Sequence, residues 1–452
     1  MGADSVIFIR TDGNDEIATG HLVRCLSIAR AVRKITAVTK PTLASTAGVD
    51  FTSSDNKQEN SRIIFLVSDE TSKSLLNSFF EYEAEFPIHI LETARYNDLE
   101  AELPELVELA GNYSFVSDGS LNSTSKPILL VDSYFVTEKY FLSLKKYFLL
   151  AYLDDLRAFD YPVDLVINYD ILTAKTQKEY EAFYSRAGEK LLGGAYAPLR
   201  PQFQSATVSI LDVYSSRTAA FIKKDDLDMV NAKNNDGICH VLIASGGSDP
   251  YHTTFNLTKH LLKECPTGYC FELILGSMNP DKRRLEELAE CPNQPIMTSS
   301  LTTTSVMSAT NEGCSVASQI TLHQNVSDMA SLMRSCHLAL SAAGTTLYEL
   351  CAVGVPTASF IIADNQIASA QAFAENNAIP CLGDVRSNEE DVKKEAACWV
   401  TSMNPYIQDS NKKQYQYQKY QDISEHMRQL VDGNGAIRIA EALVTLYEID
   451  RD

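Results

Sequence analysis

The chain alternates short apolar runs with segments of helical periodicity. In its first half, the strand-like runs occupy residues 6–9, 63–67, 88–91, 128–132, 149–155 and 164–168. Helical patterns separate several of these runs, which is typical of a mostly parallel sheet covered on both faces. This half of the sequence therefore predicts an α/β fold.

The same pattern restarts after a break rich in Gly and Pro, LLGGAYAPLRPQF (191–203), and a charged stretch. Further strand-like runs follow at residues 240–245, 271–276, 338–344 and 357–363. We therefore expect an N-terminal domain (1–205), a linker (206–236) and a C-terminal domain (237–452) whose last helix packs back on the first domain. Both domains should be Rossmann-like, with mostly parallel sheets that face across a cleft. Ligands of such folds bind outside the carboxyl ends of strands, so this cleft is the expected site.

Four polar segments look inserted into this pattern: 44–62, 114–126, 298–319 and 403–424. The first three are rich in Ser, Thr and Asn, and we expect them to be mobile loops because they bury little apolar surface. The fourth alternates Gln, Tyr and Lys and fits an exposed helix equally well. We assign no chemistry to any of them.

Composition narrows the class of protein. The 452 residues are 45% apolar and 22% charged, which is ordinary for a globular protein of two or three domains. The net charge of −20 argues against a nucleic-acid partner, although it leaves room for a small anion pocket made of backbone N–H groups. We see neither a signal peptide nor an apolar run long enough to cross a bilayer, so we expect a cytoplasmic protein without membrane insertion.

The ten cysteines are scattered. CPTGYC (265–270) holds the one close pair, and no second pair completes a zinc site, so we expect reduced, packed cysteines, no metal and no cofactor. A monomer is compatible with the sequence, which does not determine the oligomeric state.

The segment ATGHLVRCLSIA (18–29) places polar chemistry at the start of a helix. His21 and Arg24 lie one helical turn apart, away from the apolar stripe that includes Leu22 and Leu26. His21 is a candidate general base or acid that faces a ligand, or alternatively a capping or surface histidine. Arg24 either binds a phosphate or pairs with an acid such as Asp12 or Asp132.

Carboxylates also end two of the strand-like runs. Asp132 follows ILLV, and Asp154 and Asp155 follow AYL. These residues suit acid/base chemistry at the cleft edge, or cap the next helix and hold a loop.

Two Gly-rich turns in the second half resemble anion-binding turns. SAAGTT (341–346) joins a strand to a helix, so Gly344, Thr345 and Thr346 are candidates to bind a diphosphate through backbone N–H groups and hydroxyls. Glu349 either accepts hydrogen bonds from a ribose diol or complements the helix dipole. SGGSDP (245–250), with Gly246 and Gly247, forms the second turn. Asp328 is expected to cap a further helix.

These motifs occur together in one known family. In order, they are DGNDEIATGHLVRCLSIA, VDSY, YLDDL, LLGGAYAPLRPQF, LIASGGSDP, MASLMRSCHLALSAAGTTLYELCAVGVPT, ADNQ and LVDGNGAIRIA. The chain resembles the UDP-sugar hydrolases of pseudaminic acid biosynthesis and the related spore-coat polysaccharide proteins. That resemblance implies the two-domain GT-B architecture.

The resemblance also implies site residues. His21 matches the catalytic histidine that orients or activates water, and Tyr134 matches a tyrosine of the sugar site, with Ser133 where the family usually has histidine. Val326 falls in the uracil-binding segment, Gly344, Thr345 and Thr346 at the diphosphate helix, and Glu349 at the ribose-binding position. Asn365 and Gln366 fall where the family contacts sugar and diphosphate. To these substrate-binding residues we add Gly20, Arg24, Asp132, Gly246 and Gly247.

The implied activity is hydrolysis of a UDP-linked diacetamido-trideoxy sugar to UDP and free sugar, with inverting attack by water. Such an enzyme serves the synthesis of nonulosonic (pseudaminic) acid or a surface polysaccharide. The alternatives are a glycosyltransferase on the same scaffold and an inactive nucleotide-sugar binding protein.

Overall fold

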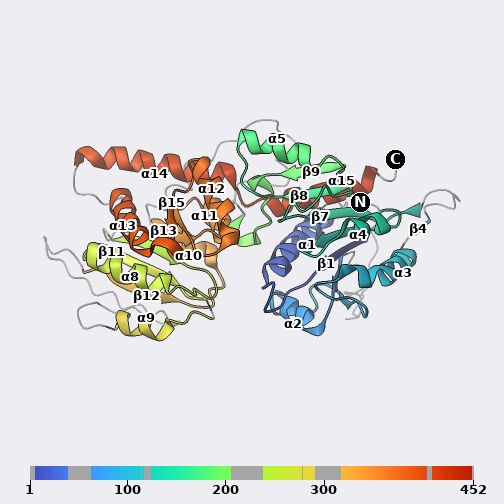
Figure 1. Ribbon diagram of the computed structural model, residues 1–452, viewed down its shortest axis with the longest axis horizontal. Coiled ribbons are helices and arrows are strands. Elements are labelled where there is room, and N and C mark those ends of the chain that lie inside the picture. Colours follow the sequence, from blue (N-terminus) through green and yellow to red (C-terminus); the bar gives the residue numbers. More distant parts are fainter. Residues whose placement is uncertain are drawn as a thin grey trace, which may run out of the picture. The chain divides into compact units, whose positions relative to one another are not determined.

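Two parallel β-sheets, one in each half of the chain, organise the fold (Figure 1). The computed structural model describes residues 6–38, 63–113, 115–116, 124–204, 238–276, 278–290, 317–404 and 410–449. It divides into unit 1, Met1–Pro201 with Asn434–Asp452, and unit 2, Gln202–Gly433. The expected linker, 206–236, and the polar segment 44–62 lie outside the described residues.

The sheet of unit 1 has seven strands in the order β3-β2-β1-β6-β7-β8-β9. All neighbouring strands are parallel. Their bounds are β1 (Ile7–Thr11), β2 (Ile63–Val67), β3 (Ile88–Ile90), β6 (Ile128–Asp132), β7 (Leu149–Leu153), β8 (Leu165–Asn168) and β9 (Glu189–Leu192). A separate antiparallel pair joins β4 (Phe115–Val116) and β5 (Thr124–Ser125).

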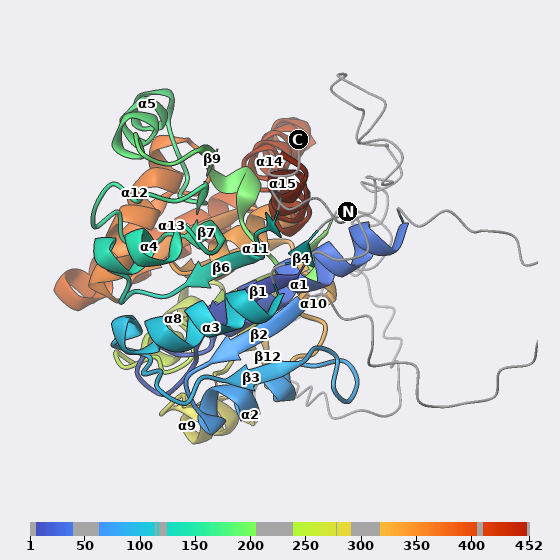
Figure 2. The same ribbon diagram turned by 90° about the vertical axis from the view of Figure 1, so that its right-hand side faces the viewer.

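Helices cover both faces of this sheet (Figures 1 and 2). They are α1 (Gly20–Val38), α2 (Glu70–Ser78), α3 (Leu103–Tyr113), α4 (Glu138–Leu144), α5 (Ala174–Phe183) and α15 (Gly435–Ile449), with short 3-10 turns η1 (Leu99–Glu102) and η2 (Gly194–Tyr196). A third 3-10 turn, η3 (Pro201–Phe203), lies where the chain passes from unit 1 to unit 2. Strands β1, β6 and β7 are buried on both faces, which explains why they read as continuous apolar runs.

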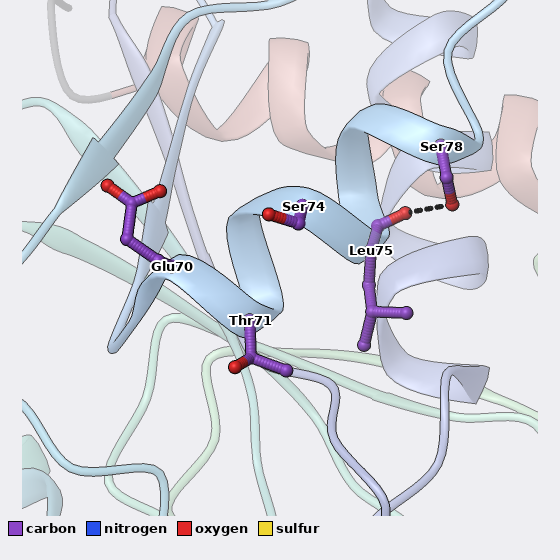
Figure 3. A pocket seen from close by; sticks show the side chains of 5 residues that line it. All are labelled: Glu70, Thr71, Ser74, Leu75 and Ser78. Carbon is purple, nitrogen blue, oxygen red and sulfur yellow. Dashed lines mark hydrogen bonds between the residues drawn. The ribbon is translucent and has the colours of Figure 1, made fainter.

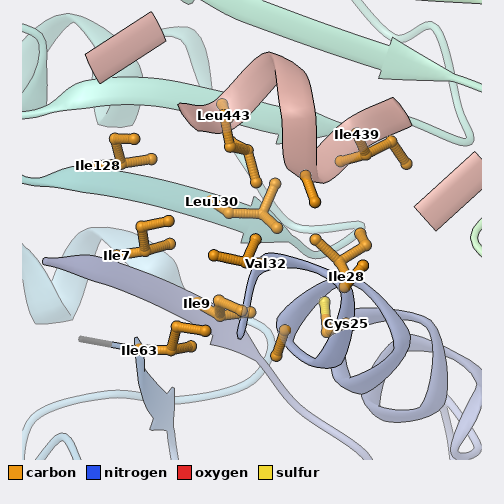
Figure 4. Packing of buried hydrophobic residues seen from close by; sticks show 14 of the residues in the cluster. Ile7, Ile9, Cys25, Ile28, Val32, Ile63, Ile128, Leu130, Ile439 and Leu443 are labelled. Carbon is orange, nitrogen blue, oxygen red and sulfur yellow. The ribbon is translucent and has the colours of Figure 1, made fainter. Parts of the chain in front are cut away.

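The last helix of the chain completes the core of unit 1 (Figure 4). Ile439 and Leu443 of α15 are fully buried and pack with Ile28 and Val32 of α1 and Leu130 of β6. The chain therefore returns to its first unit after it has built the second.

The sheet of unit 2 has six parallel strands in the order β12-β11-β10-β13-β14-β15. They are β10 (Cys239–Ala244), β11 (Tyr269–Ile274), β12 (Gln319–His323), β13 (Leu338–Ala342), β14 (Thr357–Ile361) and β15 (Cys381–Asp384). The helices are α8 (Thr253–Glu264), α9 (Lys282–Ala289), α10 (Met329–Ser335), α11 (Thr346–Val353), α12 (Ile367–Glu375), α13 (Val385–Met403) and α14 (Ser410–Leu430), with the turn η4 (Asp364–Gln366).

The α/β prediction is confirmed, and every strand-like run corresponds to a strand within a few residues. Five strands of the described residues were missed, namely β4, β5, β9, β12 and β15. Two of the polar segments were expected to be loops, and this was wrong for part of each. Segment 114–126 contains β4 and β5, and segment 298–319 ends in the first residue of β12. In the fourth polar segment, residues 410–424 lie in α14, so the helical alternative holds there.

Gly433 and Gly435 lie where the chain passes from unit 2 back to unit 1, and each lies close to the backbone of another segment, so neither position has room for a side chain. A Cβ on Gly433 would lie 2.1 Å from the carbonyl oxygen of Phe203, and a Cβ on Gly435 would lie 2.2 Å from the carbonyl oxygen of Ala197.

Across the described residues, none of the helices combines the length and the apolar character that a bilayer span requires.

Candidate functional site

The first candidate site lies at the carboxyl edge of the unit 1 sheet, where the strand order reverses. β1 and β6 are neighbours, and the chain continues from β1 toward β2 but from β6 toward β7. Thr11 and Asp132 are in register, so the two strands end together. Open α/β sheets bind ligands outside such a switch point. The N-terminus of α1, with His21, follows β1 at this edge.

His21 and Asp132 form a buried pair at this position. Nδ1 of His21 lies 2.6 Å from Oδ1 of Asp132, and the two side chains are 4% and 0% exposed. Arg24 donates to the same carboxylate through Nε at 2.7 Å and Nη2 at 2.5 Å. The alternative of an exposed surface histidine is therefore wrong.

The charge of Asp132 determines which nitrogen of His21 carries the proton. Burial alone would raise the pKa of Asp132, but the Arg24 charge and the hydrogen bonds from Arg24 and His21 hold it well below its usual range. An ionised carboxylate only accepts hydrogen bonds, and the 2.6 Å contact of Nδ1 with Asp132 is shorter than its 2.9 Å contact with Nη2 of Arg24, so we assign Nδ1 as the donor to Asp132. A neutral imidazole then keeps its lone pair on Nε2. Within the described ranges, Nε2 makes no hydrogen bond to another residue, so it is available to take a proton from a ligand.

Arg24 is held between two carboxylates. Its Nη1 lies 2.7 Å from Oδ2 of Asp155 and donates to the Tyr169 hydroxyl at 2.6 Å. Burial would lower the pKa of Arg24, but Asp132 and Asp155 raise it well above its ordinary value. Of the partners considered for Arg24, the structure shows Asp132. Tyr169 was missed, although its position directly after β8 was a usable signal.

Tyr134 lies beside the imidazole. The two rings meet edge to face, with centroids 4.4 Å apart and an interplanar angle of 75°. Burial and the nearby charge of Asp155 raise the pKa of Tyr134, so its hydroxyl stays protonated at neutral pH. Because Tyr134 is 40% exposed, it is placed to contact a ligand that reaches His21. The neighbouring Ser133 accepts a hydrogen bond from the backbone N–H of Phe135.

Two other acids considered from the sequence serve the fold. Asp12 accepts a hydrogen bond from Arg10 at 2.5 Å inside the protein. Asp154 accepts from the hydroxyls of Tyr161 and Tyr184, at 3.0 and 2.6 Å. Both carboxylates are buried and already hydrogen-bonded, which favours the structural interpretation for each.

The second candidate site lies at the corresponding edge of unit 2. β10 and β13 are neighbours at which the strand order reverses again, and α11 follows β13. In the described residues, the backbone N–H groups of Thr345 and Thr346 lack a hydrogen-bond acceptor. A Cβ on Gly344 would meet nothing within 4 Å, so this turn is open. Glu349 lies half-buried in the first turn of the helix. Unbonded N–H groups at a helix N-terminus favour an anion.

The Gly-rich turn after β10 differs from the turn before α11. Gly246 has a φ of +80°, and a Cβ on Gly246 or Gly247 would also meet open space. However, the Asp249 carboxylate accepts hydrogen bonds from the backbone N–H groups of Thr253 and Thr254, at 2.8 and 2.9 Å. The first turn of α8 is therefore already capped by an anionic side chain. Of the two turns, the one before α11 is the better diphosphate site.

The other residues expected to bind substrate lie in loops beyond the strands of unit 2. Val326 follows β12 and is half-buried, ahead of α10, which Asp328 caps as predicted. Asn365 is exposed in η4. Gln366 accepts a hydrogen bond from the backbone N–H of Ile362 at 3.0 Å, so part of its side chain holds this loop.

A polar cluster in unit 2 was missed by the sequence analysis. Nδ1 of His240 lies 2.8 Å from Oε1 of Glu272, and Nε2 of His323 lies 2.7 Å from Oε2. Cys270 donates its thiol to Oε1 at 3.3 Å. These residues come from three neighbouring strands that are far apart in sequence, so no ligand spacing along the chain indicates them.

A hollow along α2 shares no lining residue with these clusters (Figure 3). Its lining residues are Glu70, Thr71, Ser74, Leu75 and Ser78. Ser78 donates a hydrogen bond to the backbone oxygen of Leu75. One carboxylate and small side chains from a single helix do not make a catalytic arrangement.

The chain is similar in sequence to a known protein over part of its length. Over 211 residues, or 46% of this chain, it is 26% identical to the spore coat polysaccharide biosynthesis protein SpsG of Bacillus subtilis. The match covers 51% of that protein, so the chain spans about half the length of the curated relative it matches. No protein-family model matches the chain.

Solved structures share the fold over nearly the whole chain. MurG of Acinetobacter baumannii has a TM-score of 0.52 at 13% identity and covers 98% of this chain and 99% of its own. UGT89C1 of Arabidopsis thaliana, complexed with quercetin, has a TM-score of 0.50 at 10% identity, with 98% and 100% covered. Alr3699/HepE of Anabaena, in complex with UDP, has a TM-score of 0.50 at 11% identity with the same coverage. The two Rossmann-like units thus have the GT-B fold.

Proposed function

We propose that this protein is a nucleotide-sugar enzyme of polysaccharide biosynthesis, and more narrowly a hydrolase of a UDP-linked sugar. The observation that carries the narrower proposal is the His21–Asp132 pair, with Nδ1 held at 2.6 Å and Nε2 available. The likeness to SpsG supports the coarser class. The preferred substrate is a UDP-linked diacetamido-trideoxy sugar, whose free sugar would enter nonulosonic (pseudaminic) acid or surface polysaccharide synthesis.

The base is an imidazole fixed by a carboxylate. Nε2 of His21 removes a proton from water while the water oxygen forms a bond to the anomeric carbon. The bond from that carbon to the β-phosphate oxygen breaks, its electron pair leaves with UDP, and the sugar is released with inverted configuration. The Asp132 carboxylate stabilises the imidazolium that forms and stays ionised itself.

Unit 2 would hold the nucleotide. The N–H groups of Thr345 and Thr346 donate to diphosphate oxygens, and the dipole of α11 stabilises the charge that grows on the leaving group. Glu349 would accept hydrogen bonds from the ribose hydroxyls, and its position in the first turn of that helix supports this role. UDP is a stable anion, so its departure does not need a strong general acid.

The decisive experiment supplies a panel of UDP-amino sugars without any acceptor. A hydrolase converts its substrate fully to UDP and free sugar, and NMR recorded early in the reaction shows the inverted anomer. Slow leakage that accelerates only when an acceptor is added would instead identify a glycosyltransferase. UDP binding without turnover on any sugar would identify a binding protein.

Replacement of the base tests the proposed mechanism. We expect His21→Ala to lower kcat roughly 100- to 10,000-fold, because the general base is lost, while UDP affinity changes little. His89→Gln is the control, since the His89 side chain is 47% exposed on β3 of the same unit. Equal turnover by wild type and His21→Ala would refute the role of His21.

A further inference from the structure

The cluster missed by sequence lies on one face of the unit 2 sheet. Side chains alternate between faces of a strand, so Tyr269, Phe271 and Leu273 of β11 enter the hydrophobic core. Cys270 and Glu272 point to the opposite face. Strand pairing places His240 of β10 in register with Cys270, so donors from neighbouring strands converge on this face.

The donors converge on one carboxylate oxygen. His240 Nδ1 is 2.8 Å and Cys270 Sγ 3.3 Å from Oε1 of Glu272. The three donor atoms of these residues all lie within 4.8 Å of one another. Four ligands at about 2.0–2.3 Å around a tetrahedral zinc ion lie roughly 3.3–3.8 Å from one another, between the shorter contacts and the 4.8 Å limit of this cluster. Small side-chain adjustments would therefore let the three atoms surround one ion.

We propose that unit 2 binds a zinc ion through His240 Nδ1, Cys270 Sγ and Glu272 Oε1. Binding releases the Cys270 proton and moves the remaining imidazole proton of His240 to Nε2. The thiolate and the carboxylate together then neutralise the divalent charge. A water molecule supplies the fourth ligand.

The surroundings of Glu272 support this assignment. His323 Nε2 lies 2.7 Å from Oε2, which fixes the carboxylate with Oε1 directed at the other two donors. Ligating carboxylates are commonly oriented by such outer hydrogen bonds. His337 accepts a hydrogen bond through Nδ1 from the backbone N–H of His240, which fixes this part of the strand pair.

The donor types favour zinc over hard cations. Imidazole and thiolate are soft or borderline ligands that suit zinc, whereas magnesium and calcium prefer oxygen ligands throughout. The Cys270 side chain is buried and Glu272 is 8% exposed, so an ion held here is largely shielded from water. This inference does not rest on the proposed sugar chemistry, since no residue of the His21 site or the α11 turn takes part.

The test measures metal binding by the full chain. Protein is stripped with a chelator, reloaded with Zn²⁺ or Co²⁺, desalted and analysed for metal content and absorption. We expect the wild-type chain to bind one Zn²⁺. Cys270→Ser and Glu272→Gln should each lower the amount of bound metal and weaken the affinity for Zn²⁺ at least tenfold. The Co²⁺ form should show a thiolate-to-cobalt charge-transfer band that is lost in Cys270→Ser.

Controls separate this cluster from other thiols and from misfolding. Cys398→Ser removes an exposed cysteine and should leave the stoichiometry and the band unchanged. Circular dichroism verifies that each variant is folded, and Glu272→Gln nearly keeps the shape of the residue it replaces. Absence of a bound ion in reloaded wild type, or unchanged binding in folded Cys270→Ser and Glu272→Gln, would overturn the proposal.

Discussion

At Asp132, one buried carboxylate receives hydrogen bonds from three side chains of α1, namely His21, Arg24 and Cys25. Arg24 contributes a charge that keeps the carboxylate ionised, and His21 contributes the imidazole that the carboxylate orients. Under the proposed mechanism Asp132 would act through His21, as a positioning residue, whereas the sequence predicts a substrate-binding role for it.

Without the negative charge of Asp132, the imidazole of His21 should lose its fixed tautomer and orientation. We expect Asp132→Asn to lower kcat roughly 1,000- to 10,000-fold with a much smaller change in KM, because the amide favours the wrong tautomer of His21. Steady-state kinetics with the preferred UDP-sugar measures this split. A large rise in KM with kcat retained would instead make Asp132 a substrate ligand.

The depressed pKa of Asp132 also links stability to pH. In the unfolded chain an aspartate titrates near ~3.9, and in the folded protein its pKa is lower, so its stabilising contribution is present above that unfolded value. The contribution is lost as pH falls below ~4 toward the folded pKa. Urea unfolding should therefore show a gap between wild type and Asp132→Asn that is large at neutral pH and narrows in acid. Glu70→Gln, at an exposed acid of α2, should show no such narrowing.

At the scale of elements, α8 and α11 both follow Gly-rich turns in unit 2. They differ in whether a side chain accepts hydrogen bonds from the backbone N–H groups of the first turn. Asp249 occupies the first turn of α8, whereas Thr345 caps α11 without a side-chain hydrogen bond. The sequence indicates a Gly-rich turn before each helix and predicts the diphosphate before α11, but spacing does not show where the Asp249 carboxylate points. The difference favours α11 for the diphosphate.

The open turn before α11 allows a substitution that tests charge separately from volume. We expect Gly344→Asp to weaken UDP binding at least tenfold, because it places a carboxylate where the phosphates would lie. Gly344→Ala should bind nearly as wild type, since its Cβ meets nothing within 4 Å. Isothermal titration with UDP compares the three proteins. Equal affinities would exclude this turn as the nucleotide site.

Elements with strong periodicity were predictable and short polar ones were not. β6 and β13 consist almost entirely of apolar or small residues, so hydrophobicity alone identifies them. β9 contains Glu189 and Lys190, and β15 contains Asp384, at exposed or half-exposed positions. These charged residues interrupt the apolar runs by which the other strands were predicted.

The candidate site was predictable only in part. His21 was identified by its position at a helix start, but its pairing with Asp132, 111 residues away, depends on which strands are neighbours. The same holds for His240 and His323, which meet at Glu272 through strand order. Periodicity along the chain carries no information of that kind.

At the scale of the molecule, α15 belongs to unit 1 although it follows unit 2 in the chain. Ile439→Ala should lower the free energy of unfolding of unit 1 by about 2 to 5 kcal/mol, because it removes fully buried side-chain volume. Val400→Ala, in the core of unit 2, is the matched variant. Hydrogen exchange of β1 and β6 should accelerate only in the first variant, and that of β10 and β13 only in the second.

The late position of α15 also has a consequence for synthesis on the ribosome. Between Pro201 and Asn434, 232 residues must be translated, which takes roughly 10 to 50 s at ~5–20 residues per second. For that time the nascent sheet of unit 1 lacks the helix that covers Leu130 and its neighbours. The apolar surface that Ile439 and Leu443 later cover is therefore open on the nascent chain until α15 has emerged.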